Sequence, residues 1–194
     1  MPDEYRAEAL KCTLRVAVAV QEARALTLTY TFENGSAQNA YLFNLLYESI
    51  GDGPVFFTEA NAIYVDLEDG AVALSHKIVP VPEGLKVEKP NVPCTTLVKP
   101  GECFQQMVAL QLPLRVRTPY RRYEDKDLAD RPVMRKAFFE LGFFLAAREG
   151  ESLGKKVKTS AGEATYFYPF SPASQKLLRV GPFSETVPVL LPRK

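Results

Sequence analysis

Near the start of the chain, apolar residues occupy every second position in two successive runs. Since neighbouring side chains of a strand point to opposite faces, this period predicts two strands that are each buried on one face. The first run starts at Leu10 and the second at Leu26. We expect the apolar residues of both runs to face one common core, among them Leu14, Val16, Val18, Leu28, Tyr30 and Phe32.

Turns and prolines divide the rest of the chain into short segments. Asn34-Gly35 ends the second run, and both residue types tolerate the positive φ of a tight turn. Residues 41–47 are apolar at nearly every position, which predicts a central strand covered on both faces. The proline-rich residues 80–93 are expected to be extended. Because the 15 prolines are spread along the chain, their spacing favours many short strands over long helices.

Three further turns predict strand pairs. Asp69-Gly70 is typical of a two-residue hairpin, and this hairpin places Leu67 opposite Val72, Val65 opposite Leu74 and Ile63 opposite His76. Residues 99–102 read Lys-Pro-Gly-Glu and predict a second turn. If that turn closes a tight hairpin, Val98 lies opposite Cys103. Residues 160–163 predict a third turn, between strands at 156–159 and 164–168.

Residues 130–147 carry conflicting signals. Asp130, Pro132 and Gly150 are placed as helix-start and helix-end signals. Against a helix, the segment is rich in phenylalanine, is apolar almost all round, and contains Gly142. We predict a short helical turn over 130–136 followed by a central strand over 137–146, with a continuous helix as the alternative.

Together these segments predict an all-β fold of about nine or ten short strands with at most short helical turns. Regularly spaced short strands separated by turns are typical of a two-sheet β-sandwich of the immunoglobulin-like kind. We expect residues 1–194 to form a single sandwich domain, with long loops at 113–136 and 169–182 and a last strand at 186–191. No repeat or low-complexity tract divides the chain.

Two segments resemble bacterial immunoglobulin-like domains, including the intracellular proteinase inhibitor type. They are residues 27–35, a strand followed by Asn-Gly, and residues 97–104, which read Leu-Val-Lys-Pro-Gly-Glu-Cys-Phe. The resemblance covers about the middle third of the chain and leaves out everything after Pro113. It implies the fold and transfers no functional residue.

Composition narrows the choice of partners. The chain has 24 basic and 23 acidic residues, so no overall charge attracts nucleic acid or an anionic membrane. The N-terminus is acidic and polar, and no stretch reaches the 18 apolar residues of a membrane span. Three cysteines, an odd number, suit a reducing compartment. We therefore expect a cytoplasmic protein whose partner is a protein, a peptide or an anionic ligand.

Residues that could carry catalysis or bind a metal are few. His76 is the only histidine, and the predicted hairpin places it at the margin of the core. Cys12, Cys94 and Cys103 lack the short paired spacing of a structural zinc site. We predict free thiols, no metal, no cofactor and no catalytic residue recognisable from the sequence.

The most unusual segment is a loop rich in arginine and tyrosine. Arginine offers a planar fork for phosphate or carboxylate, and tyrosine offers a stacking face. Eight basic and four acidic residues lie between positions 115 and 136, which leaves a local surplus of positive charge. The alternative is a solvated loop whose charges pair with the acidic residues that follow at 124–130. The candidate binding residues are Arg115, Arg117, Tyr120, Arg121, Arg122 and Tyr123.

Three hypotheses on function remain open at this point. The first is a non-catalytic binding module that uses a sheet face, an exposed strand edge or the loops at one end. The second, suggested by the resemblance, is an inhibitor or regulator of an intracellular protease. The third is an enzyme with a carboxylate-based pocket.

Overall fold

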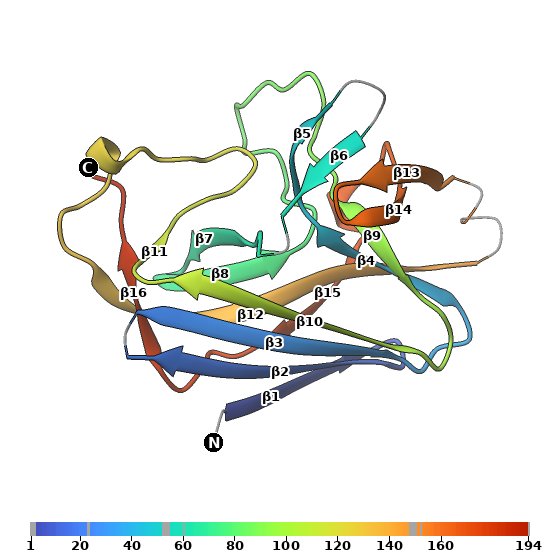
Figure 1. Cartoon of the computed structure of the whole chain (residues 1–194), viewed down its shortest axis with the longest axis horizontal. Coiled ribbons are helices and arrows are strands. Elements are labelled where there is room, and N and C mark those ends of the chain that lie inside the picture. The colour runs from blue at the N-terminus through green and yellow to red at the C-terminus, as the bar shows by residue number, and fades with distance from the viewer. Residues whose placement is uncertain are drawn as a thin grey trace.

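The computed structural model describes residues 3–22, 24–51, 55–59, 61–147, 151 and 153–193. These residues form sixteen β-strands in two sheets, of four and twelve strands, and two short 3-10 helices. The all-β, two-sheet prediction is confirmed (Figure 1). Within the described residues, the structure contains no helix with the length and apolar character of a membrane span.

The smaller sheet holds the two strands predicted from period two. Its strand order is β1-β2-β3-β10, and every pairing is antiparallel. The residues expected to face the core are all buried. The strands are β1 (Asp3–Ala9), β2 (Cys12–Gln21), β3 (Ala25–Asn34) and β10 (Cys103–Gln111).

The start of the first run was predicted wrongly. Leu10 is 52% exposed and lies with Lys11 in a turn, where both residues have positive φ. The chain before this turn forms β1, which pairs with β2. Alternating charges at Glu4, Arg6 and Glu8 mark the outer face of β1, and they hide the weaker apolar pattern of its inner face.

The larger sheet runs in the order β11-β16-β12-β4-β9-β14-β13-β6-β5, with β15 and the β7–β8 hairpin joined to β12. Sixteen strands replace the nine or ten that were predicted, because several are only two to five residues long. They are β4 (Asn39–Leu45), β5 (Tyr47–Ile50), β6 (Val55–Thr58), β7 (Tyr64–Glu68), β8 (Ala71–His76), β9 (Cys94–Val98), β11 (Leu114–Arg115), β12 (Val133–Ala146), β13 (Lys155–Thr159), β14 (Gly162–Tyr166), β15 (Lys176–Val180) and β16 (Thr186–Leu190).

Strand β12 is the long strand that holds the larger sheet together. It pairs with β4, β8, β15 and β16 along its 14 residues. The strand predicted at 137–146 is confirmed, but the helical turn predicted at 130–136 is wrong from Val133 onward. Val133 to Lys136 pair with β16 instead. A partner strand from the end of the chain thus overrides the local helix signals.

Aromatic residues of both sheets meet in the core. Tyr30 of the smaller sheet packs against Phe139 of β12 with ring centroids 5.0 Å apart, and Phe32 packs against Phe143 at 5.3 Å. All four side chains are buried. Burial of one large apolar side chain contributes roughly 1.5–3 kcal/mol, so this contact fixes how the two sheets face each other.

Two of the three predicted hairpins form. Asp69-Gly70 joins β7 to β8, with Leu67 opposite Val72 and Val65 opposite Leu74. The turn at 160–161 joins β13 to β14.

The third hairpin, at 99–102, does not form. A turn is present there, since the Glu102 N–H donates to the Lys99 carbonyl at 3.0 Å. Its two arms belong to different sheets, because Val98 pairs with Ala40 and Cys103 pairs with Glu33. The turn therefore carries the chain from one sheet to the other.

Both predicted long loops contain regular structure. Residues 169–182 hold a 3-10 helix (Pro172–Ser174) and then β15, which pairs with β12. Residues 113–136 hold β11, a 3-10 helix (Asp125–Asp127) and the part of β12 that pairs with β16.

Candidate functional site

Strand β10 forms one edge of the smaller sheet and pairs only with β3 among the described strands. In an antiparallel strand, the N–H and C=O of one residue point the same way, and the direction alternates along the chain. The N–H of Ala109 points away from β3, because it donates to the side-chain oxygen of Asn61 at 3.2 Å. By the same parity, Cys103, Gln105 and Met107 direct their backbone groups away from β3, on the free side of the strand. Figure 1 shows β10 beside β3 in this sheet.

The sequence of β10 lacks the features that protect sheet edges. Its nine residues read Cys-Phe-Gln-Gln-Met-Val-Ala-Leu-Gln, without charge or proline. The opposite edge strand, β1, carries Asp3, Glu4, Arg6 and Glu8 in seven residues. Charged residues and proline keep foreign strands from pairing with an edge. Of the two edge strands of this sheet, β10 is therefore the one whose residues leave it open to pairing with another strand.

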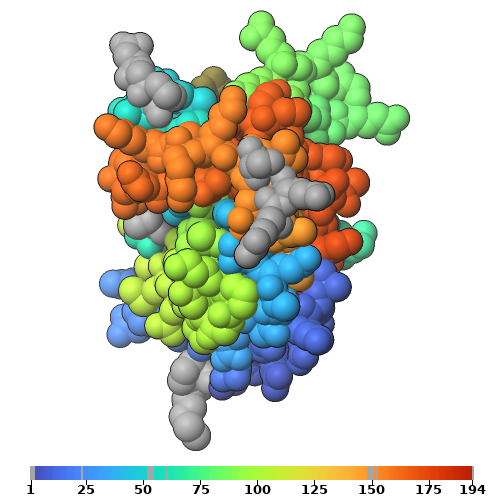
Figure 2. All heavy atoms as spheres, turned by 90° about the vertical axis from the view of Figure 1, so that its right-hand side faces the viewer, coloured from blue at the N-terminus to red at the C-terminus, as the bar shows by residue number. Residues whose placement is uncertain are grey.

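The surface around β10 is accessible. Met107 is 61% exposed, and Cys103 is also exposed. Figure 2 shows the yellow-green atoms of this part of the chain on the surface, beside the blue atoms of the first strands. The inward residues Phe104, Gln106, Val108 and Leu110 alternate with the exposed ones and hold the strand on the core.

A cleft adjoins the C-terminal end of β10. It has a volume of about 330 Å³ and lies between β10 and the β7 region of the larger sheet. Its lining combines apolar side chains with two arginines. The lining residues include Asn61, Ile63, Val65, Leu110, Leu112, Arg115 and Arg117.

The predicted arginine loop borders this cleft. Arg117 is fixed by its backbone, since its N–H donates to the Val65 carbonyl at 2.8 Å and its carbonyl accepts from the Val65 N–H at 2.9 Å. Its guanidinium contacts Glu48 and lies 3.8 Å from Glu59. Burial lowers the pKa of Arg117, and the nearby cation of Arg122 lowers it further.

The other arginines of the loop also have carboxylate partners. Arg121 lies 3.5 Å from Asp66, Arg122 lies 3.8 Å from Glu48, and Arg115 contacts Asp125. Of the four arginines of the loop, Arg115 alone pairs with an acidic residue of segment 124–130, as the solvated-loop alternative predicted for all of them. Glu48, Asp66 and Glu59 come from distant parts of the sequence, so sequence neighbours could not reveal them.

The two tyrosines of the loop differ from each other. The Tyr120 hydroxyl accepts the backbone N–H of Asn91 at 3.0 Å, which ties the loop to the proline-rich segment. Tyr123 is half-buried. The structure brings Arg115 and Arg117 to the cleft, whereas Arg121 pairs with Asp66 and does not line it.

His76, which was predicted at the margin of the core, is completely buried and hydrogen-bonded. Its Nε2 lies 2.8 Å from the Ala62 carbonyl and its Nδ1 lies 3.0 Å from the Tyr30 hydroxyl. A carbonyl only accepts, so Nε2 carries the proton of the neutral ring. Burial lowers the pKa of His76 to about 4, opposed in part by the bond to Ala62.

This histidine makes stability depend on pH. The unfolded state binds a proton near pH 6.5 and the folded state only near pH 4. The contribution of His76 to the free energy of unfolding is therefore highest above pH 6.5. It falls by about 3 kcal/mol as the pH drops toward 4, because the unfolded chain takes up the proton first. We expect urea unfolding of the His76→Gln variant to show a smaller loss of stability between these pH values than the parent chain. Equal losses in both proteins would contradict this role.

The three thiols are free in the structure, with Cys12 and Cys94 buried and Cys103 exposed. Burial raises the pKa of Cys94 to about 12, so this thiol stays protonated. Among the described residues, no three His, Cys, Asp or Glu side chains are grouped to hold a metal ion.

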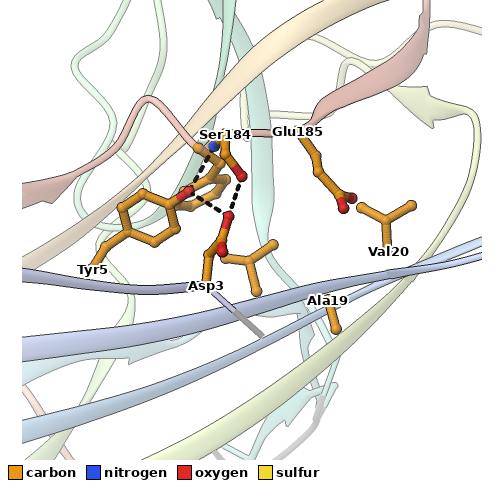
Figure 3. Close-up of a pocket in the computed structure, with 8 residues that line it drawn as sticks. Asp3, Tyr5, Ala19, Val20, Ser184 and Glu185 are labelled. Atoms are coloured by element: carbon orange, nitrogen blue, oxygen red, sulfur yellow. Dashed lines mark hydrogen bonds between the residues drawn. The ribbon is translucent and has the colours of Figure 1, made fainter. Parts of the chain in front are cut away.

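A smaller cavity, of about 260 Å³, lies beside β1 (Figure 3). Asp3, Tyr5 and Ser184 converge there: the Ser184 N–H donates to the Tyr5 hydroxyl at 2.6 Å, and the Ser184 hydroxyl contacts Asp3. A serine nucleophile needs an adjacent base. The single histidine of the chain lies in the core with Tyr30, so these bonds act to tie β1 to residues 183–185.

Comparison of the chain with known protein families, with curated proteins and with solved structures finds no match. The features of this chain that bear on function are therefore the edge of β10, the adjoining cleft and the arginines that line it.

Proposed function

We propose that this chain is a non-catalytic protein-binding module that takes an extended segment of its partner as an additional strand on β10. The observation that supports this function is the open edge at Cys103, Gln105 and Met107. Each of these residues presents one backbone donor and one acceptor outward. An extended peptide that pairs with such an edge gains main-chain hydrogen bonds, and its side chains fit into pockets beside the edge.

The scaffold is suited to this role. Strand β10 pairs with β3 along its whole length and is buried on its inner side by residues such as Val108. The edge is therefore held in strand geometry before a partner arrives, which lowers the entropic cost of binding. Each added backbone hydrogen bond contributes a net of about 0.5–1.5 kcal/mol. Several such bonds and one filled pocket are enough for specific recognition.

The protease-inhibitor hypothesis and the immunoglobulin-like arrangement of the sheets both depend on the resemblance to immunoglobulin-like domains. That arrangement of the two sheets remains a proposal, supported by the antiparallel sheet of four strands packed on a second sheet. Protease inhibition stays a prediction with no contact in the site that favours it over general peptide binding. A cytoplasmic location is also proposed, and the exposed thiol of Cys103 on the binding edge suits a reducing compartment.

The test uses a proline on the binding edge. Because the Met107 N–H points outward, the Met107→Pro variant loses a donor to the partner and keeps the hydrogen bonds to β3. Short random peptides displayed on phage are selected on the parent chain and then measured as synthetic peptides. We expect Met107→Pro to weaken their binding about tenfold or more, with little change in melting temperature.

The matched control is Met107→Ala, which shortens the same exposed side chain and keeps the N–H. It should bind the selected peptides nearly as well as the parent chain. The proposed function is contradicted if no peptide is selected, or if Met107→Pro binds the peptides as tightly as Met107→Ala.

A further inference from the structure

The cleft of about 330 Å³ lies where a strand added to β10 would leave the edge. Leu110 and Gln111, at the end of β10, form one wall. Asn61 stands between edge and cleft, since it accepts the Ala109 N–H and also lines the cleft. A peptide paired with residues 103–107 therefore has its next side chains beside this opening.

The apolar residues that line the cleft select for an apolar side chain. Val65 belongs to β7 of the larger sheet and Leu110 to β10 of the smaller one, and Ile63 and Leu112 adjoin the ends of these strands. The volume is at the lower end of the range of ligand pockets, which is about 300–1,000 Å³. A cavity of this size receives one or two side chains rather than a large ligand.

The arginines that line the cleft select for negative charge. The Arg115 side chain is 54% exposed, and its partner Asp125 is 79% exposed. Exposed ion pairs of this kind are weak, so a carboxylate of a ligand can replace Asp125. Arg117 is held more firmly, between Glu48 and Glu59 on one side and the backbone of Val65 on the other. Arg115 is thus the exchangeable cation.

We infer that the preferred partner is an extended peptide that combines an apolar side chain, seated in the cleft, with a neighbouring carboxylate that pairs with Arg115. This inference rests on the proposed strand addition to β10 and specifies which peptides the edge selects. The carboxylate belongs to an aspartate, a glutamate or the C-terminus of the partner. A second copy of this chain is the competing occupant, because its own β10 carries no charge.

The experiment compares two surface cations. Arg115→Gln removes the charge at the rim of the cleft. Lys126→Gln removes a charge from the same loop that pairs with Glu124 and does not line the cleft. The peptides selected on the parent chain should be enriched in an acidic residue next to an apolar one. We expect Arg115→Gln to weaken the best synthetic peptide about tenfold and Lys126→Gln to leave it unchanged.

Changes in the peptide complete the test. Replacing its acidic residue with the matching amide should abolish the difference between Arg115→Gln and the parent chain, and replacing its apolar residue with alanine should weaken binding to both. The inference is overturned if the selected peptides lack the acidic residue, or if Arg115→Gln binds them normally. It is also overturned if the chain self-associates through β10 and selects no peptide.

These outcomes separate the inference from the proposed function. Peptides that lose affinity on Met107→Pro and keep it on Arg115→Gln would leave strand addition intact and remove only the role of the cleft. Peptides that bind Met107→Pro as well as Met107→Ala would remove both.

Discussion

Replacing Glu140 with glutamine should lower the free energy of unfolding by about 3–5 kcal/mol, as expected when one partner of a buried ion pair is removed. The Glu140 side chain is only 5% exposed and contacts the ammonium group of Lys77, itself 14% exposed. A second carboxylate oxygen lies 3.6 Å from Arg179. Without the charge of Glu140, the one carboxylate left to Lys77 among the described residues is Glu68, at 4.0 Å.

Urea unfolding measures this loss, and a double variant provides its control. Lys77→Met combined with Glu140→Leu removes both charges and fills the space with apolar atoms. Because an unpaired buried charge causes the loss, the double variant should be clearly more stable than Glu140→Gln. If the double variant is the less stable of the two, the ion pair itself is a net source of stability and this explanation fails.

Replacing Phe139 with alanine should lower the free energy of unfolding by a similar amount, about 3–5 kcal/mol. Phe139 is completely buried in the middle of β12 and packs on Tyr30 at 5.0 Å and on His76 at 6.0 Å. Its removal leaves a cavity at the contact between the two sheets. Neighbours that belong to hydrogen-bonded strands have little freedom to close this cavity.

The matched control is Phe139→Leu, which keeps most of the volume and should lose less than about 1.5 kcal/mol. Chemical unfolding of both variants gives the two losses directly. Similar small losses for both would mean that the sheets do not depend on this aromatic contact.

Local pattern predicted the strands with one buried and one exposed face. The alternation in β2 and β3 and the turn at Asp69-Gly70 need only neighbours in the sequence, because both express the two-residue period of a strand. The strand at 137–146 was also found, since its phenylalanines outweighed the helix signals around Asp130.

Pairing between distant strands could not be predicted in the same way. The turn at 99–102 has correct turn chemistry, yet nothing in its residues says that its arms join different sheets. Val133 to Lys136 form a strand because β16 lies beside them, and β16 is about fifty residues away in the sequence. Tertiary pairing of this kind overrides local preference.

The candidate site shows the same division. The arginine loop stood out by composition, but its partners Glu48, Glu59 and Asp66 come together only in the fold. The absence of charge in the nine residues of β10 can be read from the sequence. The position of β10 at a sheet edge cannot, and an uncharged strand is ordinary in the centre of a sheet and exceptional at its edge.

Hydrogen exchange at the amides of β10 reports directly whether a partner strand is added at this edge. The outward N–H groups of Gln105 and Met107 should exchange rapidly in the free protein and slowly when a selected peptide is bound. The inward amides of Gln106 and Val108 bond to β3 and should be protected in both states. Binding of the peptide without new protection at Gln105 and Met107 would contradict strand addition at this edge.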